Sequence, residues 1–498
     1  MEPVTVPFGE YLPDLPALGN PGSRVINNCL PWNAGVYVSL KDLAAVSDAL
    51  TAAARGAMAV RSSAAVAYTL AGDATKLYEF SGPSDAVTDR SGGTYTLVGG
   101  ENWEFAKWGN KVITTNINDG PSIITLGAAS NFAALGGSPP KARHITVIKD
   151  FVVLANLDES GTLYPTKVRW SGVNNEATWA ASASTQSDAQ ILNSAADYGG
   201  GWIMGIRGGE FGTIFQEFSI WRMTYVGSPA IFQFDEILPG YGTPAKNSIV
   251  QYGNLIFYLG QSGFQLLING MDVDRIGLHK VDKTFYNEVK STYMYNVIGA
   301  IDQNLRVVIW IYPGSGSSGG IQNKYLAYNW ITKKWAGGDI NAEWLFSGLG
   351  QGYTLEELDT VSASLDALPE SLDSRRWTEG AIQISAFNTS HKQATFSGTT
   401  LAATLETGEQ QLFPGRRAYV SAVRPLVDGS GAVATVAAVT RKLQSETPAV
   451  GSAVATHSET NLAPLRSDAR YHRFRVVTSG AYDFAVGLDV YAKPSGQR

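Results

Sequence analysis

The chain has 498 residues, a formal net charge of −6, 53 glycines and only 16% charged residues, a profile that predicts many tight turns and few solvated helices. Its apolar residues form no run of 18 or more, so we expect neither a membrane span nor a cleaved secretion signal. The single cysteine, Cys29, excludes a disulfide framework and a thiolate metal cluster, and the acidic balance argues against a protein that coats nucleic acid.

Short β-type runs begin after an N-terminal arm, residues 1–55, which we expect to contribute to a platform. A first unit is predicted with strands at 56–60, 66–70, 76–80 and 94–98. Hairpins with turn residues between the strands then recur at intervals of about 40 to 60 residues. These predicted hairpins cover residues 103–115, 145–155, 202–217, 246–259 and 296–312, and a last unit covers 381–405.

A repeat of three or four short strands predicts an all-β fold built around a β-propeller of six or seven blades over residues 56–407. The alternative is a series of β-sandwiches, whose strands also follow one another every 8 to 12 residues. Sandwiches do not repeat one hairpin turn at this period, so the pattern favours the propeller.

Residues 354–373 form an acidic arm with six carboxylates and no base. Two interpretations stay open for it. In the first, the arm packs on the propeller and its carboxylates are solvated. In the second, the carboxylates repel the phosphates of a nearby nucleic acid, which keeps it from adhering. The candidate lumen residues are Glu356, Glu357, Asp359 and Asp366.

Three chemical motifs are weak. The sequence GSGSSG at 314–319 matches a dinucleotide-binding loop, but a predicted strand follows where that fold requires a helix. Residues 171–179 resemble the Asp-box turn of sialidase blades only loosely, and the five histidines have no metal-ligand spacing. We therefore predict no catalytic, cofactor-binding or metal-binding residue, and no enzyme activity.

Residues 411–498 differ from the rest in net charge and in the length and alternation of their predicted strands. They carry 11 Lys and Arg against 6 Asp and Glu, or +5, which leaves −11 for residues 1–410. Strands are predicted at 417–424, 432–439, 471–477 and 484–492, with one buried face and one wet face, as in a separate antiparallel β-sandwich. Its basic face holds Arg470, Arg473, Arg475 and Tyr471. This face is suited to DNA or, as we prefer, to acidic neighbours such as Asp489 or an adjacent subunit.

Several segments resemble the tail-hub proteins of tailed bacteriophages, also called nozzle, tail tubular B or packaged-DNA stabilisation proteins. The resemblance covers most of the chain. It is carried by PFGEYLPD at 7–14, KVRWSG at 167–172 with residues 183–192, FQEFSIWRMTYVGSPAIFQFD at 215–235, GNLIFYLGQSGF at 253–264 and ARYHRFR at 469–475.

What the resemblance implies is a structural protein of the virion, best known in short-tailed phages and assembled in the host cytoplasm. It implies a homo-oligomeric ring, which we expect to have six copies, below the portal and adaptor proteins. The ring encloses the DNA exit channel, lets DNA pass without tight binding and offers attachment surfaces to tail fibres or spikes. The alternative function is a carbohydrate-binding or glycosidase-type propeller, which requires a carboxylate pair in the propeller funnel.

Overall fold

The fold is all-β, as the sequence predicts. A computed structural model describes residues 3–33, 35–82, 85–193, 199–350, 358–359, 362–368, 371–372, 380 and 382–496. Strands in these residues form seven sheets, and the helices are short: α1 (Asp282–Glu288), η1 (Lys246–Ser248), η2 (Ser291–Asn296) and η3 (Leu365–Ala367). None of the helices in the described part of the chain is both long and apolar enough to cross a membrane.

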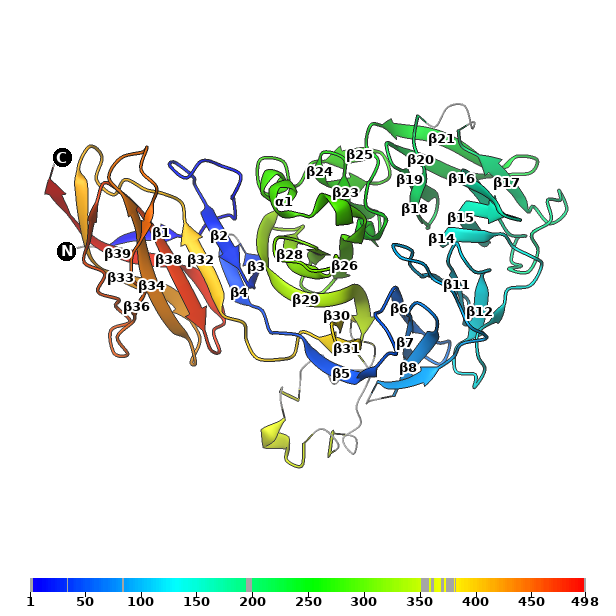
Figure 1. The fold of residues 1–498 in the computed structure, drawn as a ribbon, viewed down its shortest axis with the longest axis horizontal. Helices are drawn as coiled ribbons and strands as arrows, with labels where there is room; N and C mark the ends of the chain where they lie inside the picture. Colours follow the sequence, from blue (N-terminus) through cyan, green and yellow to red (C-terminus); the bar gives the residue numbers. More distant parts are fainter. Residues whose placement is uncertain are drawn as a thin grey trace.

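Six successive four-stranded antiparallel meanders make up the larger part of the molecule (Figure 1). We number them sheets 1 to 6 in chain order. Sheets 1 to 3 are β6 (Ala57–Arg61), β7 (Ala67–Gly72), β8 (Leu77–Ser81) and β9 (Ala86–Asp89); β10 (Glu104–Trp108), β11 (Lys111–Thr115), β12 (Ser122–Thr125) and β13 (Ala133–Ala134); and β14 (Lys141–Ile148), β15 (Phe151–Glu159), β16 (Thr162–Trp170) and β17 (Asp188–Ile191).

Sheets 4 to 6 continue the series in the same order. They are β18 (Ile203–Arg207), β19 (Gly212–Gln216), β20 (Ser219–Gly227) and β21 (Ile231–Pro239); β22 (Val250–Tyr252), β23 (Leu255–Gly260), β24 (Gly263–Ile268) and β25 (Asp272–Asp274); and β26 (Ile298–Asp302), β27 (Val307–Tyr312), β28 (Gln322–Asn329) and β29 (Lys334–Leu349). Sheet 6 is part of a larger sheet that continues through β29.

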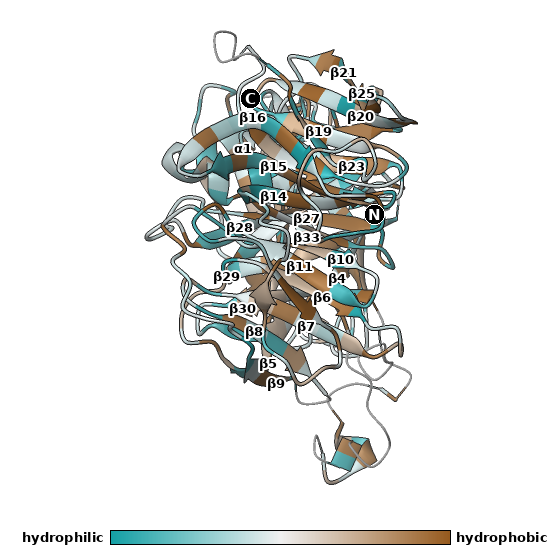
Figure 2. Cartoon of the chain, turned by 90° about the vertical axis from the view of Figure 1, so that its right-hand side faces the viewer, coloured by the Kyte–Doolittle hydropathy of each residue, from teal (hydrophilic) through white to brown (hydrophobic). Residues whose placement is uncertain are grey.

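The six sheets close into a ring because each neighbouring pair has its own apolar core. Leu70 of sheet 1 packs in one cluster with Val112 of sheet 2, and equivalent clusters lie between sheets 2 and 3, 3 and 4, 4 and 5, and 5 and 6. A further cluster closes the ring, because it holds Phe80 of sheet 1 together with Ile309 of sheet 6. Viewed from the side, brown apolar positions recur along the stacked strands (Figure 2).

Glycine at the hairpin turns explains why the sequence located these strands well. Gly109 between β10 and β11, and Gly253 between β22 and β23, have φ of 58° and 57°. This left-handed conformation suits the two-residue turns of β-hairpins, and glycine adopts it without a Cβ clash. The predicted hairpins at 103–115, 145–155, 202–217 and 296–312 are confirmed, whereas in 246–259 the first residues form η1 rather than a strand.

The fourth strand of sheet 1 was predicted wrongly. It is β9 (Ala86–Asp89), paired with β8, and not residues 94–98. In that segment the N–H groups of Tyr95 and Leu97 donate to Thr75 and Ala74 in the turn before β8, at 3.1 and 2.9 Å. Tyr95 and Leu97 are buried and the residues on either side of each are exposed, so this loop has the alternation of a strand.

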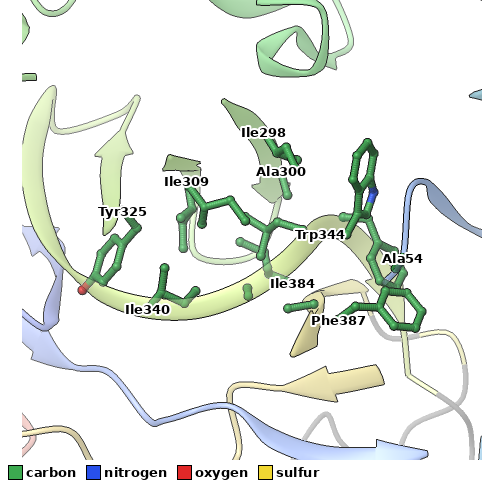
Figure 3. Close-up of a cluster of buried hydrophobic side chains, with 14 of the residues drawn as sticks. Ala54, Ile298, Ala300, Ile309, Tyr325, Ile340, Trp344, Ile384 and Phe387 are labelled. Atoms are coloured by element: carbon green, nitrogen blue, oxygen red, sulfur yellow. The ribbon is translucent and has the colours of Figure 1, made fainter. Parts of the chain in front are cut away.

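The curved strand β29 joins the ring to the rest of the chain. Its first half pairs with β28 and its second half with β30 (Ile382–Asn388), which continues through β31 (Lys392–Thr395) to β5 (Ala44–Ala49). Figure 3 shows Tyr325 and Ile340 along this curve, with Ile384 and Phe387 toward its other end. All four belong to the cluster that closes the ring.

A platform of two packed sheets stands beside the ring (Figure 1). The first sheet contains β1 (Val4–Pro7), β3 (Cys29–Asn33), β4 (Val36–Ser39), β33 (Arg417–Asp428), β37 (Ser467–Ala469) and β39 (Phe484–Gly496). The second continues from β29 through β2 (Ser23–Asn27), β32 (Ala403–Thr407), β34 (Val433–Arg441), β35 (Ala449–Val450), β36 (Val454–Ala455) and β38 (Tyr471–Ser479). One apolar cluster, including Val6, Leu405, Val420 and Val476, lies between them.

The predicted last propeller unit at 381–405 does not form. The strand β32 pairs with β2 and β38, so it belongs to the platform although it lies before residue 411. The strands β30 and β31 extend β29 toward β5 instead. Three short strands in succession have the sequence pattern of a blade. Only their pairing partners, which are distant in the chain, show that they are not one.

Alternation along the C-terminal strands is confirmed for β38 and interrupted in β39. His472, Phe474 and Val476 are buried, and the residues between them are partly exposed. In β39 the predicted common face of Phe484, Val486, Leu488, Val490 and Ala492 breaks, since the first two are 38% and 41% exposed. A β-bulge opposite Leu426 and Val427 skips Val486 and reverses the face of the strand.

The N-terminal arm holds the helix α1 against sheet 5. The Asp14 carboxylate accepts hydrogen bonds from the N–H groups of Lys283 and Thr284, both at 2.8 Å, and so caps the first turn. Asp282 lies beneath, where it accepts from the Phe264 N–H at 3.0 Å. Burial, with a smaller contribution from Asp14, raises the pKa of Asp282 to about 6.

We predict that Asp282→Asn stabilises the protein at neutral pH. The raised pKa means that Asp282 favours folding fully only below its unfolded pKa of 3.8, and this contribution is lost as the pH rises through about 6. At pH 7 the neutral amide keeps an acceptor for Phe264 and avoids the buried charge, so the free energy of unfolding should rise by about 2 kcal/mol. Urea titrations at pH 4 and pH 7 test this, because the gain should disappear at pH 4. An equal effect at both values contradicts it.

Candidate functional site

A cavity of about 380 Å³ lies where the first strands of the six sheets meet. These strands are the innermost of the ring, since β10 contacts both β6 and β14, β14 contacts β18, and β22 contacts β26. Every sheet contributes to the wall. Residues that represent the six sheets are Met58, Glu104, Thr146, Arg207, Gln251 and Gly299.

Glu104 is the carboxylate of this axial cavity. It accepts hydrogen bonds from Nδ1 of His144 at 2.8 Å and from the Ile145 N–H at 3.1 Å, both on the neighbouring sheet. Burial opposes its charge, but His144, the Arg207 guanidinium and the Ile145 N–H together lower the pKa of Glu104 below its usual range. The carboxylate is therefore ionised and fully engaged at neutral pH.

Arg207 supplies the opposite charge from sheet 4. Its guanidinium donates to the carbonyl oxygens of Ile206 at 2.9 Å and Ile249 at 2.7 Å, the second on the way into sheet 5. Burial lowers the pKa of Arg207, and the attraction of Glu104 works against that shift. Backbone carbonyls from two sheets thus hold a buried cation at the axis.

A second charge cluster lies on the same inner strands. Glu101, just before β10, contacts Arg143 at 3.0 Å and Lys246 at 3.3 Å. Burial again opposes ionisation, but these two cations lower the pKa of Glu101. Arg143 also donates to Oδ1 of Asn156 at 2.8 Å, so the cluster connects sheets 2, 3 and the start of sheet 5.

These inner groups join sheets and have no arrangement typical of catalysis. Each carboxylate is held by cations or N–H donors, and a paired carboxylate is a poor nucleophile or general base. Sequence analysis missed them because their partners lie about one repeat apart. The separations are 40 residues for Glu104 and His144, and 42 for Glu101 and Arg143. The repeat length of about 40 to 60 residues was the signal in the sequence that could have located these partners.

The predicted interface residues are mostly engaged inside the chain. Arg473 and Arg475 both bind the buried carboxylate of Glu406 on β32, at 2.9 and 2.7 Å. The partner is therefore Glu406 and not Asp489, whose Oδ1 accepts from the Thr5 hydroxyl at 2.7 Å. The pairing of β32 with β38 places Glu406 beside these arginines, whereas Asp489 lies on β39 in the other platform sheet, and neither arrangement was visible in the sequence.

Arg470 and Tyr471 lie together at the start of β38. The Arg470 guanidinium lies 5.8 Å from the centre of the Tyr471 ring, and Arg441 approaches the same ring at 5.8 Å. Arg441 also forms an ion pair with the buried Glu409, with Nε 2.8 Å from Oε1. Two buried glutamates thus offset part of the positive charge in this region, Glu406 at Arg473 and Arg475 and Glu409 at Arg441.

Two of the four predicted lumen carboxylates are apart from the axial cavity. Asp359 and Asp366 are exposed and do not belong to the cavity wall. Glu356 and Glu357 lie outside the described residues. The segment with η3 projects from one edge of the molecule in both views (Figures 1 and 2).

The weak motifs form ordinary structure. The GSGSSG loop at 314–319 connects β27 to β28, another strand, and the Gly314 N–H donates to Asn323 across the loop at 2.8 Å. In the Asp-box-like turn, Trp179 is 1% exposed and its Nε1 donates to the Glu176 carbonyl at 2.8 Å. Within the described ranges no group of three or more His, Cys, Asp or Glu side chains is placed to hold a metal ion.

Comparison with known proteins identifies no family. No family model and no curated protein matches the chain. Among solved structures, the chain is similar to the crystal structure of the computationally designed Ika8 protein, at 7% identity and a TM-score of 0.38. The alignment covers 70% of this chain and 98% of the designed one. A TM-score of 0.38 is too low to carry an argument about function.

We predict that Glu104→Gln destabilises the protein by about 2 kcal/mol, because it removes the charged acceptor of the His144 and Ile145 hydrogen bonds and the attraction to Arg207. The matched control is Glu210→Gln, since Glu210 is 92% exposed and its nearest cation, the Lys149 ammonium, is as far as 4.0 Å away. That variant should stay within about 0.5 kcal/mol of the parent. Urea denaturation of the three proteins measures this, and equal stability of the two variants contradicts the role of Glu104.

Proposed function

We propose that the protein is a non-enzymatic structural component of a bacteriophage tail, a hub that forms a ring around the DNA exit channel. The resemblance stated above suggests this role, and the arrangement of the chain supports it in three ways. They concern the ring of sheets, the axial cavity and the platform.

The ring of six sheets supports a six-bladed β-propeller with an attached β platform. Apolar cores join every neighbouring pair of sheets, and one of them joins the last sheet to the first. The resembling segment at 215–235 runs through β19, β20 and β21, and the one at 253–264 covers β23 and the turn after it. In this proposal the resemblance rests on blade strands, which are structural elements.

The axial cavity is too small for duplex DNA to pass, and charged side chains line its wall. Its volume is about 380 Å³, and Glu104 and Arg207 stand in its wall. A DNA channel must therefore lie between copies of the chain and not along the axis of one copy. This is the observation that carries the proposal of a multi-copy ring.

The platform offers a surface for contact between copies. Val433, Phe484 and Val486 are 58%, 38% and 41% exposed, and they lie near the two adjoining hairpin turns at 429–432 and 480–483. Large apolar side chains gathered at one end of a sheet are typical of interaction sites. Arg473 and Arg475 share the Glu406 carboxylate, which reduces the positive charge that can hold DNA and suits a conduit that DNA passes without tight binding.

In the tail, the ring would lie below portal and adaptor proteins and present surfaces to fibres or spikes. This places the protein in the virion after assembly in the host cytoplasm. The glycosidase-type alternative requires two available carboxylates in the propeller funnel. In the described residues, Glu104 accepts from His144 and the Ile145 N–H and Glu101 is paired with Arg143 and Lys246, which disfavours cleavage.

Electron microscopy of phage particles that contain the chain tests the proposal. We predict a closed ring of six copies with DNA density in the central channel that they enclose. Phe484→Glu combined with Val486→Glu should prevent incorporation, because charge at the buried centre of a contact is unfavourable. Leu443→Glu is the control, since Leu443 is 58% exposed and lies outside this platform end. A single copy per particle, or normal incorporation of the double variant, would overturn the proposal.

A further inference from the structure

A second cavity, of about 510 Å³, opens beside the axial cavity and is independent of the proposed subunit contacts. We call it the mouth pocket. It shares Ile298 and Trp344 with the axial cavity wall. Its volume falls within the range of about 300–1,000 Å³ that is common for small-molecule sites. Segments from sheets 1, 2 and 6, from the loop at 319–322 and from the turn at His391 build it.

One wall of the mouth pocket is aromatic. Trp344 stands on β29 beside the small residue Ala54 (Figure 3). Tyr295 lies against Gly100, where a side chain at position 100 would meet the ring at 3.5 Å. Glycine at 100 therefore leaves the tyrosine ring uncovered on that side. Flat apolar faces of this kind contact the C–H faces of ring-shaped ligands.

Polar groups converge from the other side. The Glu343 carboxylate accepts from the Ala54 N–H at 3.2 Å and from Nδ1 of His391 at 2.8 Å. Burial raises the pKa of Glu343, and these two donors oppose that shift. The carboxylate and the imidazole, which is 35% exposed, are thus fixed together in the wall.

Side-chain amides complete the lining. Asn296 Nδ2 donates to the Gly320 carbonyl and Gln322 Nε2 donates to the Asn296 carbonyl, both at 3.1 Å, which fixes the orientation of both amides. Asn102 is the third amide of the wall. Fixed amides beside an aromatic face give directional hydrogen bonds to hydroxyl groups.

Every charged group of the pocket already has a partner. Arg55 donates to the carbonyls of Leu97 and Val98 at 2.8 and 2.9 Å, and Glu101 is paired with Arg143 and Lys246. Glu343 is paired with His391. A cationic ligand would therefore find both carboxylates already paired, whereas a ligand with several hydroxyl groups would find hydrogen-bond partners and an apolar face. The Arg55 guanidinium contacts carbonyl oxygens rather than a carboxylate.

We propose that the mouth pocket binds one neutral sugar unit, with Tyr295 against the ring, the 9% exposed Trp344 at the base of the pocket, and Asn102, Glu343 and His391 at the hydroxyl groups. The site binds without cleaving. Glycoside hydrolysis needs an acid and a second carboxylate as base or nucleophile, and Glu101 is occupied by two cations. This binding stands apart from the tail-hub role, so either can fail without the other.

Saturation-transfer NMR on the full chain tests the proposal with glucose, galactose, mannose, rhamnose and N-acetylglucosamine as separate probes at millimolar concentration. Putrescine serves as a cationic probe. We expect transfer to at least one sugar and none to putrescine. Tyr295→Ala and, separately, Asn102→Ala should weaken binding of that sugar about tenfold, which corresponds to about 1.4 kcal/mol.

The matched control is Tyr252→Ala, because Tyr252 is 40% exposed and lies on β22, outside the pocket. It should bind the sugar as the parent does. Absence of transfer to all five sugars overturns the proposal. Transfer that survives both pocket variants, or transfer to putrescine that Tyr295→Ala removes, overturns it as well, the last in favour of a cation site.

Discussion

Charged side chains buried at the axis impose the strictest condition on this fold. A buried charge is costly unless a partner meets it, and here the partner comes from the next sheet of the ring. Glu104 meets His144 of sheet 3, and Glu101 meets Arg143 of sheet 3 and Lys246 at the start of sheet 5. Apolar cores allow one sheet to rotate slightly against its neighbour. The charge pairs are directional contacts and allow only one relative position of the two sheets. The apolar cluster between sheets 6 and 1 closes the ring, and the charge pairs fix how sheet 2 is placed against sheets 3 and 5.

The strand β29 transmits this rigidity to the platform. It pairs with β28 in the ring and with β30 beyond it, and it touches β2 at Gly337. On the platform side, Glu406 binds Arg473 and Arg475 while Glu409 binds Arg441. Two glutamates before residue 411 thus offset arginines after it. The charge asymmetry of the sequence is real, but folding converts much of it into internal pairs.

Local features were predictable from the sequence and long-range partners were not. Turn residues such as Gly109 and Gly253 located the hairpins, and alternation identified the buried face of β38. Errors arose where a distant partner decides: residues 94–98 fill a loop, β32 joins the platform, and a bulge turns Phe484 outward. The charge clusters were missed for the same reason, although their separations of 40 and 42 residues match the repeat. The mouth pocket draws on distant segments that no local pattern connects.

A double-mutant cycle between Glu101 and Arg143 tests most directly whether charge pairs one repeat apart hold the ring together. The free energy of unfolding would be measured for the parent, Glu101→Gln, Arg143→Met and the double variant. Residues coupled in a shared network give interaction energies of about 0.5–3 kcal/mol, and this account predicts a value of at least about 1.5 kcal/mol. Additive effects, within about 0.5 kcal/mol, would contradict it and leave the apolar cores as the sole cause of ring closure.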